Sequence, residues 1–324
     1  MTKKYVLISI VGIALLTILP FIGVIHIDIH ALVKADEPQG FIFWQLRVPR
    51  TLLAFIVGST LALAGLIFQN LFKNSLATPY TMGVSSGAAA ATVMALKLGI
   101  SLPFLGLNGL YVYGFLGALV TILAILGISG IVKNFSIYTM LMSGVALNFF
   151  FSSFILLIQY MLNFTETVSV LRWLMGGLTV TGYSEVIFLA PLYVFFVITT
   201  FLVRNELLLI SGGDHFAHSK GMDVNRFRIW VFIGVSFLIG VVVSITGPIG
   251  FVGLIVPHIA RLIFKDNFKP VIFLTLILGG LLLVVTDFVA RTLIPPVEIP
   301  VGIITAFLGA PFFLFVLISK LKKD

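Results

Sequence analysis

The sequence predicts an all-α, polytopic membrane protein of about ten transmembrane helices with both termini in the cytoplasm. The 324 residues are 60% hydrophobic and 10% charged, whereas about one-quarter of a soluble domain is charged. Apolar segments recur along the chain, and many approach the ~20 residues that cross a bilayer as a helix. Lysine and arginine are also unevenly distributed between alternate connections, which indicates the orientation.

We expect a single transmembrane domain over residues 1–324, built from ten apolar segments. These run roughly over residues 5–27, 51–72, 84–98, 110–132, 138–161, 186–203, 229–246, 256–264, 271–290 and 301–319. The first is interpreted as a retained helix, because its apolar run is too long for a typical signal peptide and no A-x-A-like site follows. The third and eighth are short and need not span fully, since irregular backbone at membrane depth is tolerated beside protein or a water-filled cavity.

The basic residues set the orientation. With the N-terminus inside, thirteen of the 20 Lys and Arg residues fall in the cytoplasm and six outside, with Arg261 unassigned. This places Arg204–Arg228, the longest polar interruption, on the cytoplasmic side. It holds seven charged residues and two histidines, so it cannot lie in hydrocarbon. We expect a loop in water that folds against another surface.

The connections carry further signals. The first outer loop, His26–Arg50, ends in RVPR, and Pro49 is well suited to begin a helix. After the second segment, helix breakers predict a re-entrant or tightly turned loop around Asn74–Gly83. A short interfacial helix is expected on the outside near Leu171–Met175, with Trp173 at headgroup level.

Most catalytic chemistry is disfavoured by what the sequence lacks. It contains no cysteine, no HExxH motif and no GxxxxGK[ST] phosphate loop. The five histidines are scattered, and His215 and His218 are more simply surface residues than a metal site. An enzyme and a protein-bound metal are therefore not expected.

Charged residues close to the membrane remain candidates for function. Asp287 and Arg291 are spaced i, i+4 and can pair on one helix face, either as a structural ion pair or as part of a site. Arg47, Arg50 and Arg291 all fall outside, against the positive-inside bias. Such arginines would suit docking of acidic residues from an external partner, because Arg binds carboxylates in a forked geometry.

Two apolar segments contain polar or broken stretches. The fifth carries Ser143, Asn148 and Gln159, which either hydrogen-bond between helices or line a wet path for a polar solute. The stretch Gly247–Arg261, GPIGFVGLIVPHIAR, is interrupted by glycines and Pro257 and predicts a broken helix that lines a cavity.

Motifs along nearly the whole chain resemble the iron-chelate and cobalamin uptake permeases, the membrane subunits of type II ABC importers. The motifs are RVPRTLLAFIVGSTLALAG at 47–65, FQNLFKNSLATPYTMGVSSGA at 68–88, LMSGVALN at 141–148, LRWLMGGL at 171–178, GPIGFVGLIVPHIARL at 247–262, TDFVAR at 286–291 and EIPVGIITAFLGAPFFLF at 298–315.

The resemblance implies a type II importer permease fold that pairs with a second copy or a paralogue. It implies two cytoplasmic ATPase subunits, which carry the ATP and Mg, and an external solute-binding protein. No cofactor bound by this chain is expected. Arg47, Arg50 and Arg291 would dock the binding protein.

The resemblance also assigns residues to coupling, gating and structure. Coupling to the ATPases would use Gly212, Gly213, Asp214, His215, Ala217, Lys220, Gly221 and Met222. Gate residues would be Asn74, Leu76, Ile137 and Tyr138, and Asn148 of the fifth segment is a candidate pathway residue by its polar side chain. Structural motif residues would be Gly247, Pro248, Gly250, Gly253, Pro257, His258, Arg261, Asp287, Glu298 and Pro300.

The chain departs from the family pattern at two places. It has Asn74-Ser75 where Asn-Pro is usual, and Gly213-Asp214-His215 where the coupling loop is usually more acidic.

The main hypothesis is ATP-driven uptake of an iron(III)-siderophore, with haem or cobalamin as alternative cargo. An ion-coupled secondary transporter would need buried sites near the membrane midplane, and Asp287, near one helix end, supports it weakly. An intramembrane enzyme would need paired catalytic groups, which the sequence lacks.

Overall fold

The computed structural model describes residues 2–23, 25, 27, 38–100, 109–131, 136–264 and 268–321, and all regular structure in these ranges is helical. The main helices are α1 (Thr2–Ile18), α3 (Val48–Leu71), α4 (Val84–Leu98), α5 (Leu110–Ile131), α6 (Ile137–Tyr160), α7 (Phe164–Leu174), α8 (Ser184–Leu202), α11 (Val224–Thr246), α12 (Val252–Phe264), α13 (Phe268–Thr292) and α14 (Val301–Leu321). The shorter pieces are η1 (Leu19–Phe21), α2 (Pro38–Phe41), the π-helical turn η3 (Ile42–Arg47), α9 (Arg204–Ser211) and α10 (Asp214–Ser219).

The ten predicted apolar segments are confirmed as helices. Within the described ranges, six helices are long and apolar enough to cross a membrane, and four further apolar helices are shorter. The third segment matches α4 residue for residue. The eighth begins at Val252 rather than at residue 256, so Pro257 lies inside α12 and does not precede it.

Three predicted connections turn out to be partly helical. The Arg204–Arg228 segment is not an open loop: it forms α9, α10 and the first turn of α11. The predicted outer loop ends early, because one helical run extends from Pro38 through α3 and contains both Arg47 and Arg50. The interfacial helix α7 starts at Phe164, seven residues before the expected position, because Asn163 and Glu166 form a capping box there.

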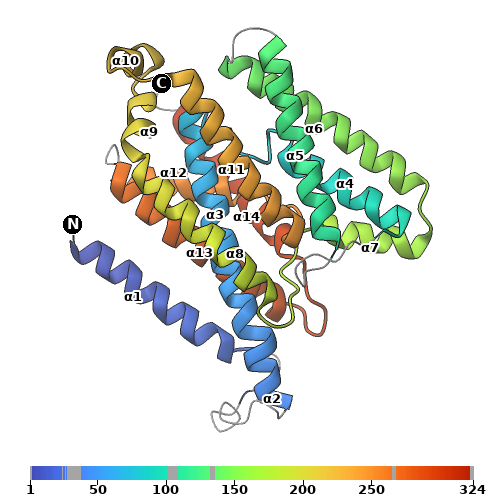
Figure 1. Cartoon of the computed structure of the whole chain (residues 1–324). Helices are drawn as coiled ribbons and strands as arrows, with labels where there is room; N and C mark the ends of the chain where they lie inside the picture. Colours follow the sequence, from blue (N-terminus) through green and yellow to red (C-terminus); the bar gives the residue numbers. More distant parts are fainter. Residues whose placement is uncertain are drawn as a thin grey trace.

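Helix α3 is at the centre of the fold. It packs most extensively against α13 and also contacts α12, α8 and α9, while α4, α5 and α6 form a neighbouring group reached through α11. Figure 1 shows this second group beside the α3 group. Close backbone approach explains the packing: a side chain at Gly58 would collide with Gly279, and one at Gly65 with Gly253.

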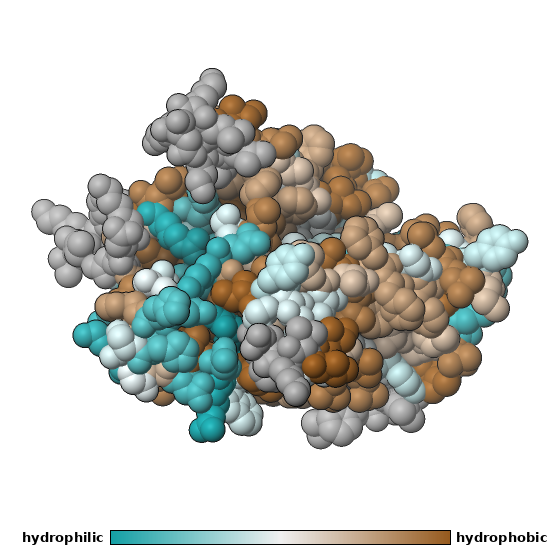
Figure 2. Space-filling model, turned by 90° about the horizontal axis from the view of Figure 1, so that it is seen from above, coloured by the Kyte–Doolittle hydropathy of each residue, from teal (hydrophilic) through white to brown (hydrophobic). Residues whose placement is uncertain are grey.

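The two ends of the bundle differ. Helix α10 and the C-terminus lie at one end and α2 at the opposite end (Figure 1), and we call these the α10 end and the α2 end. Seen from the α10 end, hydrophilic residues gather on the side where α9 and α10 lie, while apolar surface dominates elsewhere (Figure 2). A bundle with apolar flanks and one polar end is what a lipid bilayer requires.

Helices α6 and α14 leave large apolar side chains uncovered. On α6, Tyr138 is 72% exposed and Phe149 69% exposed, and on α14 Phe307 is 81% exposed. Apolar faces of this kind mark contacts with lipid or with another protein surface.

Candidate functional site

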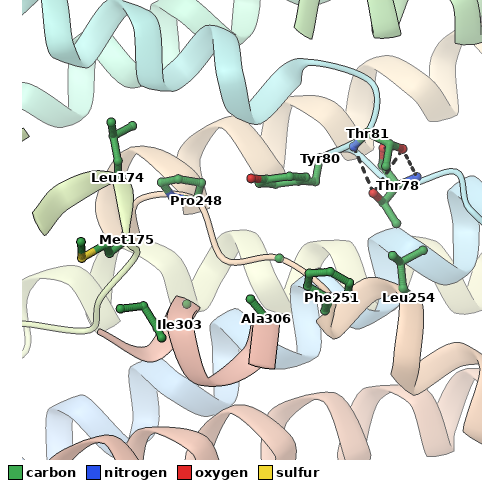
Figure 3. A pocket seen from close by; sticks show the side chains of 12 residues that line it. Thr78, Tyr80, Thr81, Leu174, Met175, Pro248, Phe251, Leu254, Ile303 and Ala306 are labelled. Carbon is green, nitrogen blue, oxygen red and sulfur yellow. Dashed lines mark hydrogen bonds between the residues drawn. The ribbon is translucent and has the colours of Figure 1, made fainter. Parts of the chain in front are cut away.

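A cavity of about 370 Å³ opens where four separate segments of the chain meet (Figure 3). Its lining residues come from the turn after α3, the end of α7, the α11–α12 connection and the start of α14. They are Thr78, Tyr80, Thr81, Leu174, Met175, Pro248, Gly250, Phe251, Leu254, Gly302, Ile303 and Ala306. The lining is mainly apolar, with the Thr hydroxyls and the Tyr80 phenol as its polar side-chain groups.

The break between α11 and α12 shapes one wall of this cavity. Gly247 ends α11 with φ 67°, and Phe251 has φ 68° directly before α12. A left-handed backbone is unusual for an aromatic residue and is held by its surroundings. The Phe251 ring packs on Gly309 of α14, where any side chain would collide with it. The expected broken helix that lines a cavity is thus confirmed.

The structural motif residues lie around this break. Gly253 packs against Leu61 and Gly65 of α3, and the His258 ring meets Phe312 edge-on at 6.2 Å between centroids. The Arg261 guanidinium donates to Gln69 Oε1 of α3 at 2.7 Å, while Gln69 Nε2 donates to the Gly253 carbonyl at 3.0 Å. Helix α12 is therefore tied to the last turns of α3.

The turn after α3 is closed by local hydrogen bonds. Asn74 Oδ1 accepts from the Leu76 N–H at 2.9 Å, and Thr78 and Thr81 bond to each other through side chain and backbone (Figure 3). The turn ends at Gly83, whose Cα faces the backbone of Gly144 on α6. The predicted tight turn is confirmed.

The predicted gate residues lie on two elements. Leu76, on the turn, is 44% exposed, and Tyr138, on α6, is 72% exposed. Ile137 begins α6, where Ser136 caps the helix by accepting from the Thr139 N–H. The Asn148 backbone lies close to Gly83, which brings the fifth segment against the turn. Their gating role remains a prediction.

Four charged residues meet at the α2 end. Arg50 Nε lies 2.9 Å from Asp287 Oδ1, and Arg50 NH1 lies 2.7 Å from Glu298 Oε2. Arg291 Nε lies 3.2 Å from Asp287 Oδ2, an ion-pair distance without hydrogen-bond alignment. The expected i, i+4 pair is confirmed, but Asp287 also binds Arg50, and it is 1% exposed. The Glu298 side chain is 50% exposed and forms the open edge of this cluster.

Arg47 lies apart from that cluster. Its guanidinium donates to the carbonyls of Pro20, Phe21 and Ile25 at 2.7–3.2 Å, and the residue is 7% exposed. The three arginines predicted to dock a partner are thus mostly buried, and they bind carboxylates and backbone carbonyls of this chain. Glu298 is the most exposed member of the charged cluster. Pro300 follows and precedes α14, with its carbonyl accepting from the Ile303 N–H.

At the α10 end, the predicted coupling residues form a small projecting helix. Gly213, with φ 122°, precedes α10, and Gly221, with φ 82°, follows it. Ala217 is fully buried against the bundle, and Met222 packs against the same core. His215, His218 and Lys220 are exposed. Gly212 caps the C-terminal end of α9. Helices α9 and α10 therefore form a short helical corner that carries the exposed residues.

Asp214 connects this helical corner to the transmembrane bundle through two ion pairs. Its Oδ1 lies 2.7 Å from Lys73 Nζ and its Oδ2 lies 3.0 Å from Arg228 NH2. Partial burial raises the pKa of Asp214, but the hydrogen bonds from Lys73 and Arg228 outweigh it and hold that pKa below its usual range.

Sequence reasoning missed several residues of these sites. Lys73, Gln69 and Phe251 were not singled out, although all three stand inside motifs, at 68–88 and 247–262. The backbone conformation of Phe251 gives no signal, because a left-handed φ at a non-glycine residue cannot be read from residue type. In the described part of the chain, no group of three or more His, Cys, Asp or Glu side chains could hold a metal.

Comparisons with known proteins agree with this architecture. Residues 7–319 match the model of the FecCD transport family. An uncharacterized ABC transporter permease, YvrB of Bacillus subtilis, is 36% identical over 96% of this chain and 93% of its own length. The Fe(3+) dicitrate transport system permease FecD of Escherichia coli is 33% identical over 97% of both chains. A solved structure described as a metal-chelate type ABC transporter in an inward-facing conformation aligns with TM-score 0.88 and 28% identity, over 99% of this chain and 100% of that one.

Proposed function

The chain belongs to the FecCD transport family, and on this basis we propose that it is the permease of an ATP-driven importer of iron(III)-siderophores. It is a transport subunit, a multi-pass protein of the bacterial cytoplasmic membrane with a type II ABC importer permease fold. One observation carries the proposal beyond the family: a polar, projecting helix, α10, at one end of an apolar bundle and a charged cluster at the other.

The α10 end faces the cytoplasm in this proposal. It carries Lys73, Arg226 and Arg228, which agrees with the positive-inside bias. The exposed side of α10 would fit a cleft on an ATPase subunit, which binds ATP and Mg. This chain carries no residue proposed to be catalytic.

The α2 end faces outward and would receive the solute-binding protein. Arg50 and Arg291 offer guanidinium groups close to the surface, with 11% and 10% side-chain exposure. Carboxylates of a binding protein could compete for Arg50 with Glu298. Arg47 would act indirectly, by holding the segment that follows α1 against the start of α3.

The transport path would run between two copies of the chain or between this chain and a paralogue. Uncovered aromatic residues on α6 and α14 support such a contact. The cavity of Figure 3 would form part of the path, since four segments meet there at breaks in the helices.

The cargo proposed is an iron chelate, because relatives include an Fe(3+) dicitrate permease. Haem or cobalamin would use the same architecture and is the alternative cargo. An ion-coupled secondary transporter is disfavoured: Asp287, the candidate ion site, is engaged by two arginines.

The test is uptake into proteoliposomes that hold this permease with the ATPase and binding protein encoded beside it. Radiolabelled ferric siderophore, haem and cobalamin are compared, with and without ATP on the ATPase side. ATP-dependent accumulation of ferric siderophore is expected. Accumulation of haem or cobalamin instead would show that the proposed substrate is wrong. Uptake that needs a proton gradient but not ATP would overturn the proposal of an ATP-driven importer.

A further inference from the structure

Asp214 occupies an unusual position, because one carboxylate contacts two cations from two different elements. Lys73 follows the last residues of α3, and Arg228 lies in the first turns of α11. Asp214 itself is the first residue of α10. One side chain therefore joins the projecting helix to the two transmembrane helices beside it.

Lys73 is held where it meets Asp214 by its own backbone. It has φ 49°, a left-handed conformation that costs a non-glycine residue ~1–2 kcal/mol. This conformation lets the Asn74 N–H bond to the Gln69 carbonyl at 3.2 Å, which closes the end of α3. The direction of the Lys73 side chain is thus coupled to the turn that begins at Asn74.

Loss of the Asp214–Arg228 ion pair would be energetically unfavourable, because Arg228 is buried. Its side chain is 2% exposed, and its Nε has no hydrogen-bond partner among the described residues. Asn225 Oδ1 lies at 3.5 Å, the limit for a hydrogen bond. Asp214 supplies the carboxylate for this buried cation, and a buried charge without its partner is strongly unfavourable.

The same end of α3 is also connected to the cavity wall. Gln69, one turn before Lys73, accepts from Arg261 and donates to the Gly253 carbonyl, both in α12. Of the cavity-lining residues, Phe251 lies directly before α12 and Leu254 lies in its first turn. Polar contacts therefore run from α10 through the last turn of α3 to α12.

We propose that Asp214 is a positioning residue that makes the coupling helix α10 and the turn after α3 move as one unit. The proposal rests on the proposed function, because α10 is the element that an ATPase would displace. Displacement of α10 would then be transmitted through Lys73 to the Asn74–Gly83 turn, and through Gln69 to α12. Without the link, α10 could move while the cavity wall stays in place.

The main test substitutes Lys73→Met, which breaks one half of the link and leaves Asp214 paired with Arg228. Lys97→Met is the matched control: the Lys97 side chain is 32% exposed and pairs with Glu166, against 35% for Lys73, but it lies outside the α10 end. Asp214→Asn is a second variant, expected to be more severe because Arg228 loses its carboxylate.

Two quantities are measured. The first is cargo moved per ATP hydrolysed by the reconstituted complex, with radiolabelled ferric siderophore as the probe. The second is the distance between spin labels at Ser75→Cys and Ser219→Cys in the purified permease, since the chain has no native cysteine. Both serines are exposed, one on the turn and one at the end of α10.

In Lys73→Met we expect the amount of cargo moved per ATP to fall about two- to fivefold, which corresponds to the energy of a partly exposed ion pair. We also expect the distribution of distances between the two spin labels to broaden. The double variant with Asp214→Asn should be no worse than Asp214→Asn alone. Unchanged coupling and distances in Lys73→Met, in a complex whose wild type transports with ATP, would overturn the link. A wild type that shows no ATP-dependent uptake would instead overturn the proposed function, and the label distances would still decide the link.

Discussion

Arg50 and Asp287 are separated by 237 positions in the sequence, yet their side chains form a hydrogen-bonded ion pair of 2.9 Å at the α2 end. The pair joins the first turn of α3 to the last turns of α13. Because Arg291 approaches the other oxygen of the same carboxylate, Asp287 neutralises two buried guanidinium groups. One buried carboxylate therefore links the start of α3 to two positions of the charged cluster.

Replacing Asp287 should strongly destabilise the protein. Asp287→Asn leaves two largely buried arginines without their shared carboxylate, and loss of one partner of a buried ion pair costs ~3–5 kcal/mol. Glu298→Gln is the control and should cost less than ~1 kcal/mol, because Glu298 is half exposed. Thermal unfolding in detergent, followed by tryptophan fluorescence, compares the two, and equal melting temperatures would contradict the expectation.

The same Glu298→Gln variant should strengthen docking of the external binding protein. Glu298 lies against Arg50 NH1 and competes with any carboxylate that a partner brings. Its removal should raise the affinity about two- to fivefold, and the gain should shrink in high salt. Binding of the cargo-loaded binding protein to nanodisc-embedded permease measures this, with Arg172→Gln on α7 as the control. Weaker binding in Glu298→Gln would show that Glu298 itself forms part of the docking surface.

Filling the cavity of Figure 3 should block transport without unfolding the protein. Ala306→Trp places a large ring in a space of about 370 Å³. Leu123→Trp, on the exposed side of α5, is the matched control. We expect uptake to be lost in Ala306→Trp alone, with unchanged melting temperatures in both. Normal uptake by a stable Ala306→Trp variant would remove this cavity from the path.

The crossing of α3 and α12 should not tolerate a methyl group. In Gly65→Ala the new Cβ would collide with the backbone of Gly253, and overpacking of this kind costs ~1–3 kcal/mol. At Gly127 of α5 nothing lies within 4 Å of an added Cβ, so Gly127→Ala should be neutral or gain up to ~1 kcal/mol of helix propensity. Melting temperatures that fall equally would argue against the tight crossing.

The anchoring of α10 should depend on pH only in acid. The pKa of Asp214 is lowered in the folded protein, so its stabilising contribution is present above the unfolded pKa of ~4 and is lost as the pH falls through the lower folded value. The distance between labels at Ser75→Cys and Ser219→Cys should stay constant from about pH 8 to 5 and broaden only in stronger acid. Broadening near pH 6 would point to a histidine instead.

The class of protein and its ten apolar helices could be predicted from the residues alone. Long apolar runs have few stable alternatives to helices in a bilayer, because every backbone polar group must be satisfied within the segment. Segment α4 could therefore be placed to the residue. Asp287 and Arg291 could be paired as well, since i, i+4 residues on one helix are neighbours whatever the tertiary fold.

The pairing of distant groups could be seen only in the folded chain. Arg50 meets Asp287, Lys73 meets Asp214, and Gln69 meets Arg261 across separate helices, and no local periodicity encodes such partners. The helical character of α9 and α10 was also missed, because a short polar helix is stabilised by packing of residues such as Leu207 and Ala217 on the bundle. Propensity alone is too weak to form helices of this length. Burial of the predicted docking arginines likewise depends on neighbours that the sequence pattern does not name.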